Sequence, residues 1–157
     1  MWQVALAAAV LVLGPALGRG VVLAYDLVPV LVPRPSPGML GAAPAAPRAV
    51  PSDAVLAVLG RVTGAALAQK ALLVAILVTC AVSAAAVLRT VAPHTGRLAL
   101  AAAALWGVWN PYVAERLAIG QWTILLGYAL TGLLLRAVIH ARQGHTLLPV
   151  CGILAVG

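Results

Sequence analysis

The residues able to do acid–base chemistry are few, and they lie at the edges of the apolar stretches. The chain has only three acidic residues, which are Asp26, Asp53 and Glu115. Asp26 directly follows one apolar stretch, and Glu115 precedes another. A carboxylate at such a boundary can have its pKa raised by partial burial and can then act as a general base. The alternative is that each acid is a solvated loop or helix-cap residue, and this alternative is strongest for Asp53.

Glu115 belongs to a polar segment, residues 109–122, within a sequence made mostly of Ala, Leu and Val. Asn110 followed by Pro111 predicts a helix start, because Asn can accept from free amides and Pro fits the first helical position. Four residues then fall at helical spacing on one face: Tyr112, Glu115, Arg116 and Ile119. We interpret the segment as the membrane-surface mouth of a helix that enters the bilayer at residue 117, with interfacial aromatics flanking its polar patch.

The composition predicts an integral membrane protein. Of 157 residues, 64% are hydrophobic and 8% are charged, and the mean hydropathy is +1.09. A soluble domain carries roughly 25% charged residues. The net charge is +7, but its basic residues are scattered, which argues against nucleic-acid binding and favours anionic lipid headgroups as electrostatic partners. No spacing of His and Cys resembles a zinc site.

The apolar stretches predict an all-α fold, a polytopic transmembrane bundle that occupies residues 1–157 as one region. About four spanning helices are expected, each near the length of about 20 residues that crosses a bilayer. Their ranges are 2–23, 70–88, 98–109 and 117–138. A partial fifth helix is expected over 146–157, so the chain reads as truncated at its carboxyl end. In the first span, Gly14 and Gly18 form a GxxxG, which is either a helix-packing motif or a chance pattern in a Gly-rich chain.

The first external loop, residues 25–67, contains many prolines, which exclude a continuous helix. Within it, the Ser52–Asp53 pair predicts the start of a short helix. Three apolar residues of that helix share a face from which Arg61 is turned away: Val55, Leu59 and Val62. Such a pattern is typical of a helix that lies on the membrane surface.

The order of the predicted spans places two of the acidic residues on the same side of the membrane. In a four-span chain the first and third connections emerge on the same side, so Asp26 and Glu115 are expected on one membrane face. The basic residues do not decide which face it is. By the positive-inside rule, the side with more Lys and Arg residues in its loops is cytoplasmic. The two short turns carry four Arg residues, but the opposite side carries six basic residues, and the rule works best for short loops.

Three segments carry a resemblance to a known family. They are Tyr-Asp-Leu-Val at 25–28 with Val-Pro-Arg-Pro at 32–35, Pro-Arg-Ala-Val-Pro-Ser-Asp at 47–53, and Asn-Pro-Tyr-Val-Ala-Glu-Arg at 110–116 with Gly-Gln-Trp at 120–122. Over residues 1–140 the chain resembles the amino-terminal part of actinobacterial GT-C-type polytopic membrane glycosyltransferases. Members of that class have many more helices and often a soluble domain. The resemblance therefore implies a fragment that is inactive alone, which needs the missing remainder of the protein as its partner.

The resemblance also implies a chemistry. Such enzymes transfer a sugar from a polyprenyl-phosphate donor to a cell-envelope glycan acceptor, on the extracytoplasmic face of the plasma membrane. The amino terminus is then cytoplasmic, and the loop with Asp26 is outside. Asp26 is the expected general base, and Arg116 the expected phosphate ligand. Glu115, Asn110 and Gln121 complete the expected substrate-binding set.

Two further points follow from the differences between this sequence and the family that it resembles. Some relatives hold a divalent metal, but here the second loop offers only Glu115 beside Arg116, which argues against a metal cofactor. The alternative function is a small structural or assembly membrane protein without catalytic activity, whose helices serve packing and whose partners are membrane lipids. A truncated transporter is less favoured, because transporters place polar or broken segments at mid-membrane and here the polar residues are expected at the boundaries.

Overall fold

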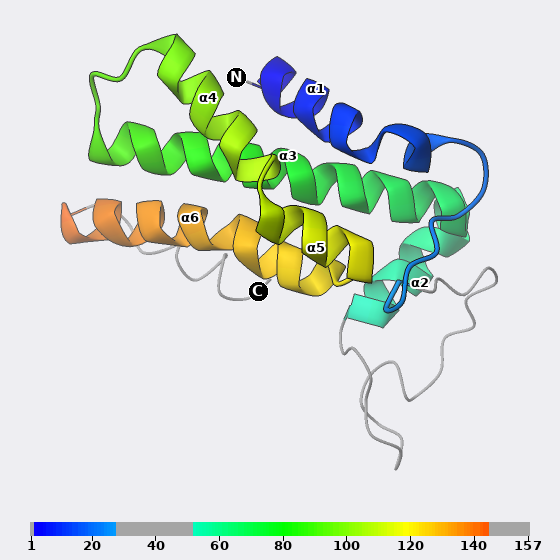
Figure 1. The fold of residues 1–157 in the computed structure, drawn as a ribbon. Helices are drawn as coiled ribbons and strands as arrows, with labels where there is room; N and C mark the ends of the chain where they lie inside the picture. Colours follow the sequence, from blue (N-terminus) through cyan, green and yellow to red (C-terminus); the bar gives the residue numbers. More distant parts are fainter. Residues whose placement is uncertain (1, 28–51, 145–157) are drawn as a thin grey trace.

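Figure 1 shows the computed structural model, which describes residues 2–27 and 52–144. Every regular element within these ranges is a helix, so the predicted all-α class is confirmed for them. The elements are α1 (Trp2–Leu13), the 3₁₀ helix η1 (Gly14–Leu17), α2 (Ser52–Thr63), α3 (Ala65–Val91), α4 (Arg97–Val108), α5 (Pro111–Ile119) and α6 (Trp122–Arg142). The predicted partial fifth helix and residues 28–51 of the proline-rich loop lie outside the described residues.

Helix α3 is the centre of the fold. It has 27 residues, which is about 40 Å at 1.5 Å per residue. Helices α1, α2, α4 and α6 all pack against it. Much of its buried surface comes from small side chains, among them Cys80, Ala81, Ser83 and Ala85. Small side chains allow neighbouring backbones to approach closely, as in helix bundles within lipid.

Two glycines outside α3 make the closest of these contacts. A Cβ added at Gly107 of α4 would lie 2.7 Å from Ala84 Cβ and 2.8 Å from the carbonyl oxygen of Cys80. A Cβ at Gly132 of α6 would lie 2.9 Å from Val87 Cγ2. The GxxxG at Gly14 and Gly18 does not act in this way within the described residues. It falls on η1 rather than on an α-helix, and a Cβ at Gly14 would meet nothing within 4 Å.

The first apolar stretch does not form one helix over residues 2–23. Helix α1 ends at Leu13, and η1 follows. Gly14 has a φ of +33°, outside the helical region, and Pro15 has no N–H to donate into an α-helical turn. The helix therefore ends where these two residues stand, and the chain continues to Leu27 without regular structure.

The bounds of the other helices differ from the predicted ranges to varying degrees. Helix α3 begins at Ala65 instead of residue 70, and α4 matches the expected 98–109 within one residue. The expected helix 117–138 is interrupted, because Gly120 adopts a left-handed conformation with φ of +83° and ends α5. Helix α6 then begins at Trp122 and extends to Arg142. A helix, α2, is present where a short helix was predicted to begin at Ser52, and Arg61 is exposed on it.

The polar segment begins at the break between α4 and α5. Gly107, near the end of α4, packs on Cys80, which lies near the middle of α3. The break between α4 and α5 at Trp109 and Asn110 is therefore level with the middle of the bundle, while the Gly120 turn is at its end (Figure 1). The interpretation of residue 109 as lying at the membrane surface remains a prediction.

Among the helices of the described residues, two, α3 and α6, are long and apolar enough to cross a membrane. Helices α1 and α4 have 12 residues each, fewer than the roughly 17 that a single straight span needs. The expected number of four spans remains a prediction at this point.

The close contact between α4 and α3 can be tested with Gly107→Ala. The added methyl meets backbone that cannot rotate away, so we expect a loss of about 1–3 kcal/mol in unfolding free energy. Gly127→Ala is the matched control, because a Cβ there meets nothing within 4 Å and Ala favours a helix over Gly by about 1 kcal/mol. Unfolding with sodium dodecyl sulfate in detergent micelles, followed by circular dichroism, gives both values. Equal stability of the two variants would contradict the packing described here.

Candidate functional site

The site begins with the turn that joins α5 to α6. After the last residue of α5, Gly120 donates to the Leu117 carbonyl at 3.1 Å and Gln121 donates to the Arg116 carbonyl at 2.9 Å. This pair of bonds, with a left-handed glycine, is the Schellman arrangement that satisfies carbonyls at a helix end. The turn fixes Gln121 beside the last turn of α5, so its side chain can reach residues of both segments.

Asp26 is tied to the same turn from a distant part of the sequence. Its N–H donates to the carbonyl of Ile119 at 2.9 Å. Its Oδ2 accepts a hydrogen bond from Nε2 of Gln121 at 3.2 Å, and the residue itself is exposed. The 24–27 segment lies close against Gly120, since a Cβ added at Gly120 would lie 2.7 Å from the Leu27 amide nitrogen. The glycine thus permits the 24–27 segment to lie against the α5–α6 turn.

Gln121 connects Asp26 to Arg116. Its Oε1 accepts a hydrogen bond from Nη1 of Arg116, while its Nε2 donates to Asp26. The three side chains therefore form a linked row, which we call the Asp–Gln–Arg row. Sequence analysis named all three residues as candidates but did not predict that Gln121 would bridge the other two.

Arg116 has further contacts that hold its guanidinium. The group lies over the Tyr112 ring, with 5.5 Å from Cζ to the ring centroid, which is a cation–π geometry. Its Nη2 is 3.6 Å from Oε2 of Glu115, whose side chain is 59% exposed. An ion pair this exposed contributes little to stability. Nε of Arg116 is buried and has no hydrogen-bond partner, so these contacts leave one donor of the guanidinium group unsatisfied.

Asn110 has a different place and a different set of contacts. It stands at the other end of α5, where its Oδ1 accepts from the Val113 amide at 3.0 Å, as the predicted cap requires. Its Nδ2 donates to the Trp106 carbonyl at 2.8 Å and approaches the Tyr128 hydroxyl at 3.5 Å. Asn110 therefore closes the break between α4 and α5, and the structure does not bring it to the Asp–Gln–Arg row.

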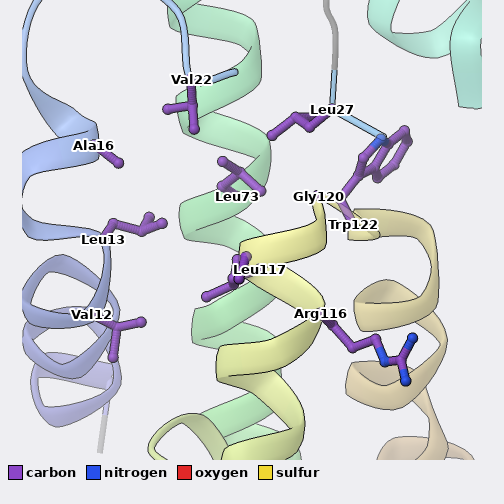
Figure 2. Close-up of a pocket in the computed structure, with 11 residues that line it drawn as sticks. Val12, Leu13, Ala16, Val22, Leu27, Leu73, Arg116, Leu117, Gly120 and Trp122 are labelled. Atoms are coloured by element: carbon purple, nitrogen blue, oxygen red, sulfur yellow. The ribbon is translucent and has the colours of Figure 1, made fainter. Parts of the chain in front are cut away.

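An apolar pocket adjoins the row. Its volume is about 230 Å³, and its walls come from α1, η1, the 22–27 segment, α3, α5 and the start of α6. The lining residues include Leu13, Val22, Leu27, Leu73, Leu117, Gly120, Trp122 and Arg116. Figure 2 shows Leu13, Val22, Leu73 and Leu117 around the apolar part, with the Arg116 guanidinium turned toward the side where α6 runs. The pocket thus has an apolar interior, and Arg116 lines it while its guanidinium group points away from that interior.

A buried glutamine holds the segment that carries Asp26. Gln69 of α3 is 1% exposed. Its Nε2 donates to the Val22 carbonyl at 2.7 Å, and its Oε1 accepts from the Val22 amide at 2.9 Å. Lys70 donates to the carbonyl of Gly18. Sequence analysis missed Gln69, although a lone amide at the start of a long apolar helix was a usable signal.

The comparisons with known proteins leave the identity open. No family model matches the chain, and no curated protein or solved structure was found to be similar to it. Within residues 2–27 and 52–144, no three His, Cys, Asp or Glu side chains lie close enough to hold a metal ion. The chemistry available in the described part is therefore that of the Asp–Gln–Arg row and its apolar pocket.

The two hydrogen bonds that hold Val22 to Gln69 can be tested with Gln69→Leu. The leucine keeps the apolar volume but leaves the Val22 amide and carbonyl without partners, at a cost of about 1–3 kcal/mol for each buried group. We expect the Val22 amide to lose most of its protection from hydrogen exchange in nanodiscs. Gln143→Leu, at an exposed site after α6, is the control and should leave Val22 unchanged. Retained protection in Gln69→Leu would show that other contacts hold the segment.

Proposed function

We propose that the chain is a multi-pass membrane protein with four crossings. Helices α3 and α6 provide two of them. Only 39% of the most apolar window of α3 and 17% of that of α6 is buried, so apolar side chains face outward, as they do toward lipid. The other two crossings are α1 continued by η1, and α4 continued by α5. Figure 1 shows α5 extending beyond the end of α4 in the same general direction.

The broken third crossing is compatible with an apolar environment because Asn110 satisfies backbone groups at the break. Irregular backbone within a bilayer is tolerated where it is buried in protein or receives hydrogen bonds. With these four crossings, Asp26 and the Gly120 turn lie at the same end of the bundle. We place that end outside the plasma membrane and the amino terminus in the cytoplasm, following the resemblance to GT-C-type enzymes.

We further propose that this end belongs to a glycosyltransferase that uses a polyprenyl-phosphate sugar. The observation that carries the proposal is the Asp–Gln–Arg row beside an apolar pocket. A lipid-linked phosphate needs a cation and an apolar surface close together, and Arg116 and the pocket supply both.

In the reaction, Asp26 would take the proton of an acceptor hydroxyl. The hydroxyl oxygen then attacks the anomeric carbon of the donor, and the bond from that carbon to the phosphate oxygen breaks. The polyprenyl phosphate leaves with its negative charge next to Arg116. Gln121 holds the base in position through its hydrogen bond to Oδ2, and exposed Glu115 can orient the acceptor.

The size of the pocket limits what this chain does alone. Sites for whole small molecules measure about 300–1,000 Å³, and this pocket has about 230 Å³. It accommodates part of a prenyl chain, so the remaining surface of the donor and acceptor would contact further helices. This agrees with the expected role as one piece of a larger enzyme.

Phosphate recognition is tested by binding of a radiolabelled isoprenyl phosphate and its alcohol to the chain in nanodiscs. Wild type should bind the phosphate at least about tenfold more tightly, since a charge-assisted hydrogen bond contributes about 1.5–3 kcal/mol. Arg116→Gln should remove this preference and leave alcohol binding unchanged. Arg136→Gln, an exposed site on α6, is the control. Equal wild-type affinity for phosphate and alcohol would refute the donor site and favour the structural or assembly protein.

The role of Asp26 is tested in a complete homologue that carries this segment with the remaining helices. Replacement of the equivalent residue with Asn keeps its size and one acceptor oxygen but cannot take a proton. We expect transfer to fall about 10²–10⁴-fold while donor binding stays within about twofold. A transfer assay with a radiolabelled polyprenyl-phosphate sugar measures this, and the 157-residue chain should show no turnover. Near wild-type turnover by the Asn variant would remove Asp26 from the mechanism.

A further inference from the structure

Helix α2 carries an apolar stripe on the side that faces away from the bundle. Its inner face packs on α3, with Ala57 and Gly60 buried. Four large apolar residues are exposed on the outer side: Val55 (50%), Val58 (61%), Leu59 (42%) and Val62 (81%). Their spacing of i, i+3, i+4 and i+7 places them on one stripe of the helix. A helix on a water-soluble domain shows the opposite arrangement, with its polar residues outward.

The stripe has polar borders. Arg61 and Thr63 flank it along the helix and are both exposed, and the Thr63 hydroxyl is satisfied by the Leu59 carbonyl at 3.0 Å. The stripe is therefore a narrow apolar band with a cation at its edge. This is the residue distribution of helices that lie in the plane of a membrane interface, where a basic residue reaches the headgroups.

The position of α2 is set by its connection to α3. A single residue, Gly64, with φ of +86°, separates the two helices. Figure 1 shows α2 at the end of the bundle where α3 begins, running at an angle to it. Leu67, in the first turn of α3, is a further exposed large apolar residue (60%) close to the stripe in sequence.

We propose that the outer stripe of α2 is embedded in the outermost acyl layer of the bilayer, with Arg61 at anionic headgroups. The basic Arg61 at the edge of the stripe and the exposed Leu67 in the first turn of α3 favour lipid as the occupant. A second copy of the chain is a poorer fit, because a stable dimer buries about 800 Å² per partner and the stripe offers four side chains. The proposal rests on α3 crossing a membrane, but not on any transferase activity.

The experiment is a nitroxide scan of the whole chain in vesicles of phosphatidylcholine with phosphatidylglycerol. Single cysteines replace Val58, Val62 and Arg61 in turn, with Cys151→Ser as background and with buried Cys80 retained. Leu135→Cys, on the exposed side of α6, is the reference for a lipid-facing site. A sample without an introduced cysteine measures any labelling of Cys80.

Val58 and Val62 labels should be relaxed several-fold more by oxygen than by a water-soluble nickel complex, as at Leu135, and the Arg61 label should show the reverse. If Leu135 faces lipid but Val58 and Val62 are accessible to nickel, α2 is in water and the proposal fails. If neither reagent reaches the two valines, protein covers the stripe and the proposal also fails. Nickel access at Leu135 itself would overturn the membrane placement together with this inference.

Discussion

The structure depends on one constraint: wherever a helix stops among apolar side chains, its backbone polar groups need partners. Three places in the described residues show how such groups find partners, two at helix ends and one in the extended chain after η1. Asn110 joins α4 to α5 by accepting from Val113 and donating to Trp106. The Gly120 turn closes α5 with two backbone bonds. Gln69 provides the bonds that the extended chain at Val22 cannot make with itself. An unsatisfied backbone group in such surroundings costs several kcal/mol.

The candidate site is a consequence of two of these solutions. The Gly120 turn leaves the Ile119 carbonyl free to accept from the Asp26 amide, and the Gln69 clamp holds the preceding residues against α3. Together they bring a carboxylate from the first connection next to an arginine from α5, 90 positions later in the sequence (26 to 116). Backbone hydrogen bonds thus bring the two segments together, and both links of the row itself, from Arg116 to Gln121 and from Gln121 to Asp26, are between side chains.

The features that followed from sequence are those with local causes. Apolar runs predicted α3, α4 and much of α6, and the Asn-Pro pair predicted the cap of α5, because these patterns act within a few residues. The end of α5 was missed, although Gly120 is a common residue for ending a helix. A glycine within an otherwise apolar run also occurs inside helices, as Gly127 and Gly132 do here. Gly120 differs from them in its close contact with Leu27, a residue far away in the sequence.

The features that did not follow from sequence depend on distant contacts. Gly14 and Gly18 match a packing motif but lie where Pro15 ends the helix, whereas the glycines that contact α3, Gly107 and Gly132, have no such motif. Gln69 is recognisable as unusual within an apolar helix, yet its partner lies 47 residues away. Likewise, the odd-loop parity placed Asp26 near Glu115 and Arg116, but could not show that Gln121 would stand between them.

That intervening glutamine has a physical meaning for the proposed chemistry. A direct pair between Asp26 and Arg116 would use the carboxylate to neutralise the guanidinium, and each would lose capacity for a ligand. Gln121 is neutral, with a donor for the carboxylate and an acceptor for the guanidinium. It fixes the positions of both groups while the base keeps free lone pairs and the cation keeps its charge. The exposed contact to Glu115 screens that charge only weakly, so the arginine that the proposal assigns to phosphate is held in place and keeps its charge.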